Sequence, residues 1–197
     1  MDKKDEKLIK YLIDNHHTSP FEHCVATFRF VVPLFIRSQH HRHRTWSFNE
    51  VSRRYTEEYI QFYEPKQFRV QSDSNRQASN ADVLINPEIS LGGYQHPNDP
   101  NFATSSDAVK MHNEQSLELY DKLRKAGVCR EQARGVLPQN LYTQYYGTCD
   151  LHNIIKFIDL RDHAGAQWEI QQVAAALAKI CKGLWPVSME AHETSKR

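Results

Sequence analysis

Apolar and polar positions follow clear local periods in the first 45 residues. Apolar side chains recur at the spacing of one helix face near the start, which predicts an amphipathic helix over residues 4–14. Residues 23–32 alternate apolar and polar side chains and are rich in β-branched and aromatic types, as is typical of a strand. Pro33 suits the first turn of a helix, so we expect a helix over residues 34–44.

The second half of the chain is dominated by helical periods. One helix is expected to begin with Asp107 as its cap and to end at Gly127. Further helices are expected over residues 129–137, 151–160 and 164–184. Because helices outnumber strands and do not alternate with them, the pattern predicts a mixed fold without the parallel sheet of a Rossmann protein.

The stretch from residue 64 to residue 106 lacks both periods. It is rich in Asn, Ser, Asp, Gln and Pro, which predicts a long loop or insertion with little regular structure. A loop of that length inside a compact domain is usually functional or disordered.

Length and composition narrow the class of protein. A chain of 197 residues with 40% hydrophobic residues suits one domain over residues 1–197. A formal net charge of +1 argues against a charge-driven grip on nucleic acid or a membrane surface. No apolar run of about 18 residues exists, the first residues are charged rather than a signal sequence, and the four cysteines form no Cys-x-x-Cys pair. We expect a cytoplasmic protein with reduced thiols.

Positive charge is concentrated in one segment, residues 42–55. This segment holds four arginines, two serines, a glutamate and an asparagine, with three aromatic residues interleaved. Arginine and serine together offer directed donors to a phosphate, and the carboxylate and amide suit a polar ring. Protonated His40, His41 and His43 could add charge. From composition alone, a salt-bridged surface helix is an equally good reading.

The spacing in this segment is more specific than its composition. Arg42-His43-Arg44 is followed after seven residues by Ser52, with Asn49-Glu50 before the serine and Arg54 after it. This pattern resembles the signature of the flavin-dependent thymidylate synthases. Other parts of the chain are similar to further segments of that family, namely residues 17–23, 131–138, 140–143, 160–161 and 166–172. The resemblance covers roughly residues 8–65 and 110–180.

The resemblance implies a fold, an activity and an assembly. The fold would be α+β, with helices packed on a small, mostly antiparallel sheet and a flavin site of its own kind. The activity would be methylation of dUMP to dTMP, with methylenetetrahydrofolate as carbon donor and NADPH-reduced FAD as hydride source. No cysteine of the chain would act as nucleophile. Four chains would form a homotetramer with shared active sites.

The same resemblance implies which residues bind dUMP. Gln39, Ser52, Arg54 and Arg134 would hold its phosphate, and Arg161 would contact the pyrimidine and act as the catalytic residue. The full set is Gln39, His40, His41, Arg42, Glu50, Val51, Ser52, Arg53, Arg54, Arg134 and Arg161.

Two of these residues have simpler readings when taken outside the family context. Arg134 could form a surface salt bridge with Glu131, and Arg161 could be an arginine at the end of a helix.

The residues implied for FAD are Ser19, Arg42, His43, Arg44, Glu50, Asp150, Leu151, His152 and Lys156. The chain departs from the family pattern at Asp150 and Lys156, where asparagine is common, and at His152, where a basic residue is common. The family also has a strand before its first helix. We expect this chain to be naturally short or truncated there.

Three alternatives stay open from the sequence. A related flavoprotein could make a hydroxymethyl or other C5-modified dUMP. A single-stranded nucleic-acid binding protein could use the basic and aromatic patch, although the near-neutral net charge disfavours it. A zinc site is disfavoured because His40, His41 and His43 are too close together to converge on one ion, and we expect no metal.

Overall fold

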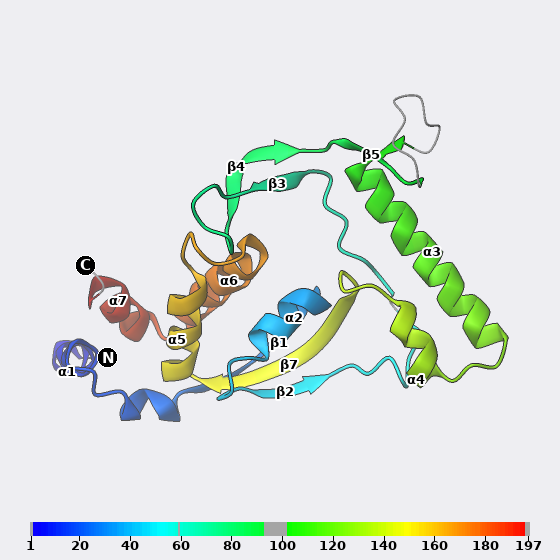
Figure 1. Ribbon diagram of the computed structural model, residues 1–197. Coiled ribbons are helices and arrows are strands. Elements are labelled where there is room, and N and C mark those ends of the chain that lie inside the picture. Colours follow the sequence, from blue (N-terminus) through cyan, green and yellow to red (C-terminus); the bar gives the residue numbers. More distant parts are fainter. Residues whose placement is uncertain (1, 59, 93–101, 196–197) are drawn as a thin grey trace. The chain divides into compact units, whose positions relative to one another are not determined.

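A computed structural model of the chain describes residues 2–58, 60–92 and 102–195 (Figure 1). The chain divides into two compact units. The terminal unit comprises Met1–Arg29, Gln39–Phe48 and Tyr146–Arg197, and the central unit comprises Phe30–Ser38 and Asn49–Tyr145.

Seven α-helices lie in the described residues. They are α1 (Lys3–Asp14), α2 (Leu34–His40), α3 (Ser105–Lys125), α4 (Arg130–Ala133), α5 (Leu151–Arg161), α6 (Trp168–Leu184) and α7 (Pro186–Ser195). Two 3₁₀ turns, η1 (Ser19–His23) and η2 (Arg134–Val136), complete the helical structure.

The described residues also form seven strands in three small sheets. The strands are β1 (Val25–Pro33), β2 (Ser47–Glu50), β3 (Phe68–Gln71), β4 (Ser79–Ile85), β5 (Glu88–Ser90), β6 (Phe102–Thr104) and β7 (Tyr142–Asp150). One sheet has the order β1-β7-β2, and the other two are the antiparallel pairs β3-β4 and β5-β6.

Strand β7 lies in the middle of the three-stranded sheet. Thr143, Tyr145 and Cys149 are buried at alternate positions, as the period of a strand requires. At the ends of β1 the amide of Leu151 donates to Cys24 and the amide of Leu34 donates to Leu141, an antiparallel order. The α+β fold with a small, mostly antiparallel sheet and no Gly-x-Gly-x-x-Gly is therefore confirmed.

The core of the terminal unit is helical. Helix α5 packs on α6, α6 packs on α7, and α7 packs on α1. The fully buried side chains on α5 and α6 recur at helical spacing: Leu151, Ile154, Phe157, Ile170, Ala174 and Cys181. None of the helices among the described residues is long and apolar enough to cross a membrane.

Helix α3 is the longest element of the central unit. Its N-cap is Thr104, whose hydroxyl accepts from the amide of Asp107 at 3.3 Å. The expected cap at Asp107 was therefore wrong by three residues, since Asp107 lies inside the first turn. The expected stop is confirmed, because Gly127 has a φ of +92°, which favours glycine.

Two expectations about the elements need correction. Residues 64–106 do not lack regular structure, because they carry the β3-β4 and β5-β6 pairs, although residues 93–101 lie outside the described part. Helix α2 ends at His40 rather than Arg44, so Arg42 and Arg44 lie in turns. The helix expected over residues 164–184 is confirmed in its end, because α6 stops at Leu184, and Pro186 then begins α7. The expectation of one domain over residues 1–197 stays a prediction.

Candidate active site

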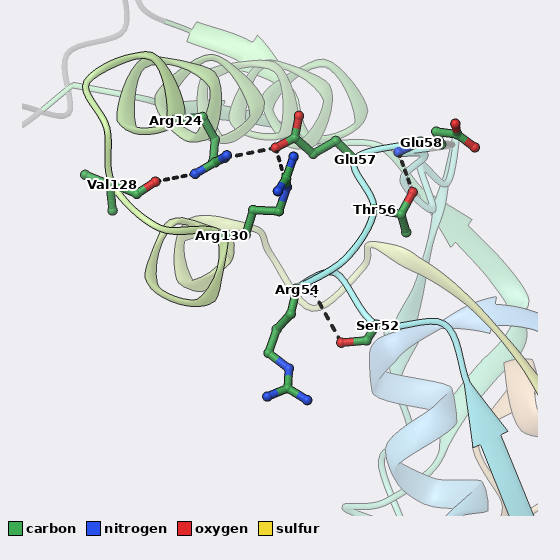
Figure 2. Close-up of polar contacts among 8 residues, drawn as sticks. All are labelled: Ser52, Arg54, Thr56, Glu57, Glu58, Arg124, Val128 and Arg130. Carbon is green, nitrogen blue, oxygen red and sulfur yellow. Dashed lines mark hydrogen bonds and ion pairs between the residues drawn. The ribbon is translucent and has the colours of Figure 1, made fainter.

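A short loop follows β2 in the central unit and carries much of the arginine-rich motif. Its first turn closes with the amide of Tyr55 donating to the carbonyl of Ser52 at 3.0 Å. The Ser52 hydroxyl accepts from the amide of Arg54 at 3.3 Å, and the Thr56 hydroxyl accepts from that of Glu58 at 3.1 Å (Figure 2). These local bonds are those expected of Ser and Thr in turns, so the sequence itself shapes the loop.

This loop borders a cavity of about 410 Å³. Five of the residues expected to bind dUMP line it, namely Glu50, Val51, Ser52, Arg53 and Arg134. The other lining residues come from α2, from η2 and from the segment that leads into β7: Leu34, Arg37, Gly135, Leu137, Gln139, Leu141, Tyr142 and Thr143. The structure thus brings the motif together with Arg134, which lies about 80 residues later in the sequence.

Glu50 is the acidic group of this cavity and is held from two sides. The Thr143 hydroxyl donates to Glu50 Oε1 at 2.7 Å, and Arg37 Nε lies 3.3 Å from the same oxygen. The Arg37 charge offsets that of Glu50, so the carboxylate is oriented and compensated. Sequence reasoning named neither Arg37 nor Thr143 as a site residue. The available signals were the basic residues near Arg37 and, for Thr143, the family-like segment 140–143.

Arg134 is the available cation of the cavity. It is exposed at the start of η2, and its guanidinium forms no ion pair with any described residue. The salt bridge with Glu131, the simpler reading of the sequence, is absent from the described part of the chain. An arginine that lines the same cavity as Ser52 and has no ion-pair partner in the described part of the chain suits an anion.

The two neighbouring arginines of the loop behave differently from each other. Arg53 lines the cavity and also donates from Nη1 to the carbonyl of Glu58, and burial lowers the pKa of its guanidinium. Arg54 does not line the cavity. Its guanidinium lies 5.3 Å from the centre of the Tyr55 ring and donates to the Tyr55 hydroxyl. The expected phosphate contact of Arg54 stays a prediction.

In the terminal unit, Arg161 and His43 form a pair. Arg161 is the last residue of α5, and its Nε donates to His43 Nε2 at 3.2 Å. Burial, followed by the Arg161 charge, lowers the pKa of His43 to about 4. His43 is therefore neutral near pH 7 and acts as the acceptor that orients the guanidinium.

His40 is part of the core rather than an exposed donor. It is fully buried, with its ring 4.5 Å from Trp46, 5.1 Å from Phe48 and 4.8 Å from Phe157. Burial, and then the charges of its neighbours, lower its pKa to about 3. The expectation that His40 and His43 add positive charge is therefore wrong.

The residues flanking His40 also contact protein groups. His41 stacks on Phe48 with ring centres 4.0 Å apart. The side-chain amide of Gln39 donates to that of Gln167. Their expected contacts with dUMP stay predictions.

The residues expected to bind FAD fall into three environments. Arg42, Arg44 and Ser19 are exposed, the first two in turns and the third at the start of η1. Leu151 is fully buried, so its side chain belongs to the core. Asp150 caps α5, because its carboxylate accepts from the amide of Asn153 at 2.9 Å. This role explains an acidic residue at a position where asparagine is common, since both types cap helices.

His152 and Lys156 line a second cavity, of about 280 Å³, within the terminal unit. His16, Thr18, Asp159 and His192 also line it, and His192 pairs with Asp159 at 2.9 Å. Lys156 thus lies at a cavity.

Arg42, Arg44 and Lys156 are three cations of the type that binds the phosphates of a dinucleotide, and of these three only Lys156 lines the second cavity. The exposed guanidinium groups of Arg42 and Arg44 form no ion pair with described residues, and Lys156 adds an exposed ammonium. Unpaired cations of this kind can bind pyrophosphate. In the described part of the chain, no group of three or more His, Cys, Asp or Glu is arranged to hold a metal ion.

These features define an α+β protein with a cavity lined by arginine and serine and no Rossmann fingerprint. The family model described as thymidylate synthase complementing protein matches residues 1–187. The chain belongs to this family.

Curated relatives agree with this assignment. The flavin-dependent thymidylate synthase of Thermus thermophilus is 40% identical over 191 residues, which is 97% of this chain and 64% of the relative. That of Thermosipho melanesiensis is 39% identical over 95% of this chain and 76% of the relative. The chain thus spans about two thirds to three quarters of the length of these relatives. The expected membership of the flavin-dependent thymidylate synthases is confirmed.

A solved structure is similar over almost the whole chain. It is the UMP/dUMP methylase PolB from Streptomyces cacaoi bound with 5-Br dUMP, with a TM-score of 0.79 and 31% identity over 98% of this chain and 81% of that one. A second structure of PolB, bound with 5-Br UMP, has a TM-score of 0.74.

Proposed function

We propose that this protein is an FAD-dependent thymidylate synthase that methylates C5 of dUMP in the cytoplasm. The balanced reaction converts dUMP, methylenetetrahydrofolate, NADPH and a proton to dTMP, tetrahydrofolate and NADP⁺. The observation that carries the proposal is the cavity where Glu50, Ser52, Arg53 and the unpaired Arg134 meet. Family membership and the nucleotide-bound PolB structures support it.

The nucleotide phosphate would be held by Ser52 and Arg134, with Arg53 and Arg54 adding charge. A hydroxyl and guanidinium groups offer several directed hydrogen bonds to a dianion. Glu50, already oriented by Thr143 and Arg37, would accept from a donor of the nucleotide or of the flavin. In this assignment Val51 contributes through its backbone, and Gln39, His40, His41 and Arg42 complete the predicted dUMP set.

Arg161 is the proposed catalytic residue. A guanidinium beside the uracil ring favours the N3-deprotonated, anionic form of the ring, because an opposite charge lowers the pKa of the neighbouring group. Negative charge in the ring makes C5 more nucleophilic toward the one-carbon donor. The hydrogen bond from Arg161 Nε to neutral His43 fixes the guanidinium and leaves its remaining donors for the substrate.

We propose that FAD is bound by Ser19, Arg42, His43, Arg44, Glu50, Asp150, Leu151, His152 and Lys156, with Leu151, whose side chain is buried, contributing only through its backbone. When bound, the flavin supplies the hydride that completes the methyl group, drawn from NADPH. The protein contributes binding, orientation and electrostatics. We also propose that four chains form a homotetramer with shared active sites. Measuring the molar mass of the protein in solution tests this assembly.

Product mass tests the proposal directly. Purified protein with FAD is incubated with dUMP, methylenetetrahydrofolate and NADPH, and the nucleotide is analysed by mass spectrometry. A mass gain of one methylene group supports thymidylate synthesis. An added oxygen would identify the hydroxymethyl product instead, and unchanged dUMP would contradict both. The Arg161→Lys variant should lose most of its activity while still binding dUMP. The control variant Lys182→Gln, which removes an exposed ion pair with Glu193, should keep the activity of the wild type.

A second substrate is tested in the same assay. PolB is described as a methylase of UMP as well as dUMP and has been observed with both brominated nucleotides. Replacing dUMP by UMP in the reaction shows whether this chain discriminates at the 2′ position. We expect dUMP to be preferred.

A further inference from the structure

Glu57 connects the motif loop to two helices of the central unit. Its carboxylate oxygen Oε1 lies 2.9 Å from Arg124 Nε and 2.9 Å from Arg130 Nε. Arg124 lies in the last turn of α3, and Arg130 is the first residue of α4. Figure 2 shows the two guanidinium groups meeting at this carboxylate. One side chain of the loop thus contacts both helices.

Arg124 also fixes the connection between these helices. Its Nη1 donates to the carbonyl of Val128, the residue after Gly127 in the turn that joins α3 to α4 (Figure 2). The hydrogen bond from Arg124, followed by the Arg130 charge, lowers the pKa of Glu57, so the carboxylate is ionised at neutral pH. The cluster of Glu57, Arg124 and Arg130 therefore ties the loop, the end of α3 and the start of α4 together.

Two residues that line the proposed phosphate cavity, Ser52 and Arg134, are close in sequence to members of this cluster. Ser52 lies five residues before Glu57 in the same loop, and Arg134 lies four residues after Arg130, one helical turn away. The amide of Arg134 donates to the carbonyl of Arg130. Moving α4 relative to the loop would therefore change the separation of Ser52 and Arg134, the two groups that face the proposed phosphate.

We propose that Glu57 is a positioning residue for phosphate recognition, which sets the separation of Ser52 and Arg134 through Arg130 and Arg124. The inference rests on the proposed function, because it assigns the cavity to the phosphate of dUMP. Glu57 does not line that cavity, so its effect passes through the other side chains. Its half-exposed position means that the cluster adds little to global stability, since exposed ion pairs contribute little.

Binding of dUMP and of deoxyuridine tests this inference. Equilibrium binding of both to the full-length flavoprotein is measured for the wild type, Glu57→Gln and Glu118→Gln. Glu118→Gln is a matched control, because it removes an exposed ion pair with Lys122 on the same helix α3. We expect Glu57→Gln to weaken dUMP binding about tenfold and deoxyuridine binding less than about twofold, as a coupling acting only on the phosphate predicts. Glu118→Gln should match the wild type.

A second variant keeps the test valid if Glu57→Gln folds poorly. Arg130→Gln should weaken dUMP binding in the same way, and the double variant should be no weaker than the weaker of the two single variants, because the three residues act as one cluster. Equal loss of dUMP and deoxyuridine binding, or wild-type dUMP affinity in Glu57→Gln, would overturn the inference. A wild type that binds deoxyuridine as tightly as dUMP would instead overturn the phosphate assignment on which it rests.

Discussion

The arginines of this chain differ in what they already contact. Arg37 is paired with Glu50, Arg161 donates to His43, and Arg124 and Arg130 share Glu57. Arg134 has no ion-pair partner among the described residues. A paired guanidinium orients its neighbours, whereas an unpaired one at a cavity gains a partner only when an anion binds.

Arg134→Gln should therefore reduce dUMP affinity with little effect on folding. Loss of a charge-assisted hydrogen bond is expected to weaken binding by about 10- to 100-fold. The unfolding midpoint should stay close to that of the wild type, because no ion pair is broken. Lys125→Gln, which removes one exposed charge at the end of α3, is the matched control. Similar affinities for the two variants would contradict the assignment of Arg134 to the phosphate.

Thr143 tests the orientation of Glu50. Thr143→Val keeps the shape of this buried residue but removes the hydroxyl that donates to Glu50. We expect a loss of about 1 kcal/mol in the free energy of unfolding, typical of one hydrogen bond, and weaker dUMP or FAD binding.

Thr148→Val on the same strand removes the hydroxyl contact with Thr27 and serves as the comparison. It should cost similar stability without affecting ligands. Ligand binding in Thr143→Val that equals that of Thr148→Val would argue against a role for the oriented carboxylate.

Among the elements, α3 and α4 are important because they carry Arg124, Arg130 and, through η2, Arg134. The start of α3 is stabilised by Thr104, which also donates to the Asp107 carboxylate at 2.7 Å. The side chain that caps a helix satisfies amides that have no partner in the helix itself. The helix is therefore capped by the hydroxyl of Thr104 and not by Asp107, the residue expected from the sequence.

Thr104→Ala should lower the free energy of unfolding by about 1 kcal/mol, the usual cost of losing a cap. Urea unfolding followed by circular dichroism measures it. Thr104→Ser keeps the hydroxyl and should retain most of the stability. If alanine and serine were equally stable, the capping bond would contribute nothing.

The whole molecule should lose stability in acid because of its buried histidines. The pKa values of His40 and His43 in the folded protein are about 3 and about 4, below the ordinary value of 6.5. Between pH 6.5 and about 4 the unfolded chain therefore binds more protons than the folded one. Stability is at its full value above pH 6.5 and falls as the pH decreases through this window.

Unfolding free energies measured from pH 7.5 to pH 4 check this expectation. His40→Gln should make the pH dependence shallower, because one of the two histidines no longer takes up a proton on unfolding. His23→Gln, at an exposed position, should leave the slope unchanged. If the stability of the wild type did not fall over this range, the lowered pKa values of His40 and His43 in the folded protein would be contradicted.

Part of the lining of the cavity could be predicted because its signals are local. The spacing of Arg42-His43-Arg44 and Ser52 identified the family, and the structure places Glu50, Val51, Ser52, Arg53 and Arg134 on one cavity. Periodicity predicted α1, β1, α5 and the end of α3, since a helix face or a strand pattern is written in neighbouring residues. The same local rules placed Gly127 at a helix end.

Long-range contacts decided the remaining features. Strands β2 and β7 were not predicted, because a strand forms by hydrogen bonding to segments far away in the sequence. His40 and Arg134 both belong to motif blocks, yet folding buries one among aromatic rings and leaves the other exposed beside Ser52. Burial and pairing depend on what other segments bring to a side chain. The sequence therefore determined which chemical groups the protein has and which stretches form most of its helices, whereas three-dimensional packing determined the charge of these groups, their partners and the contacts of Glu57.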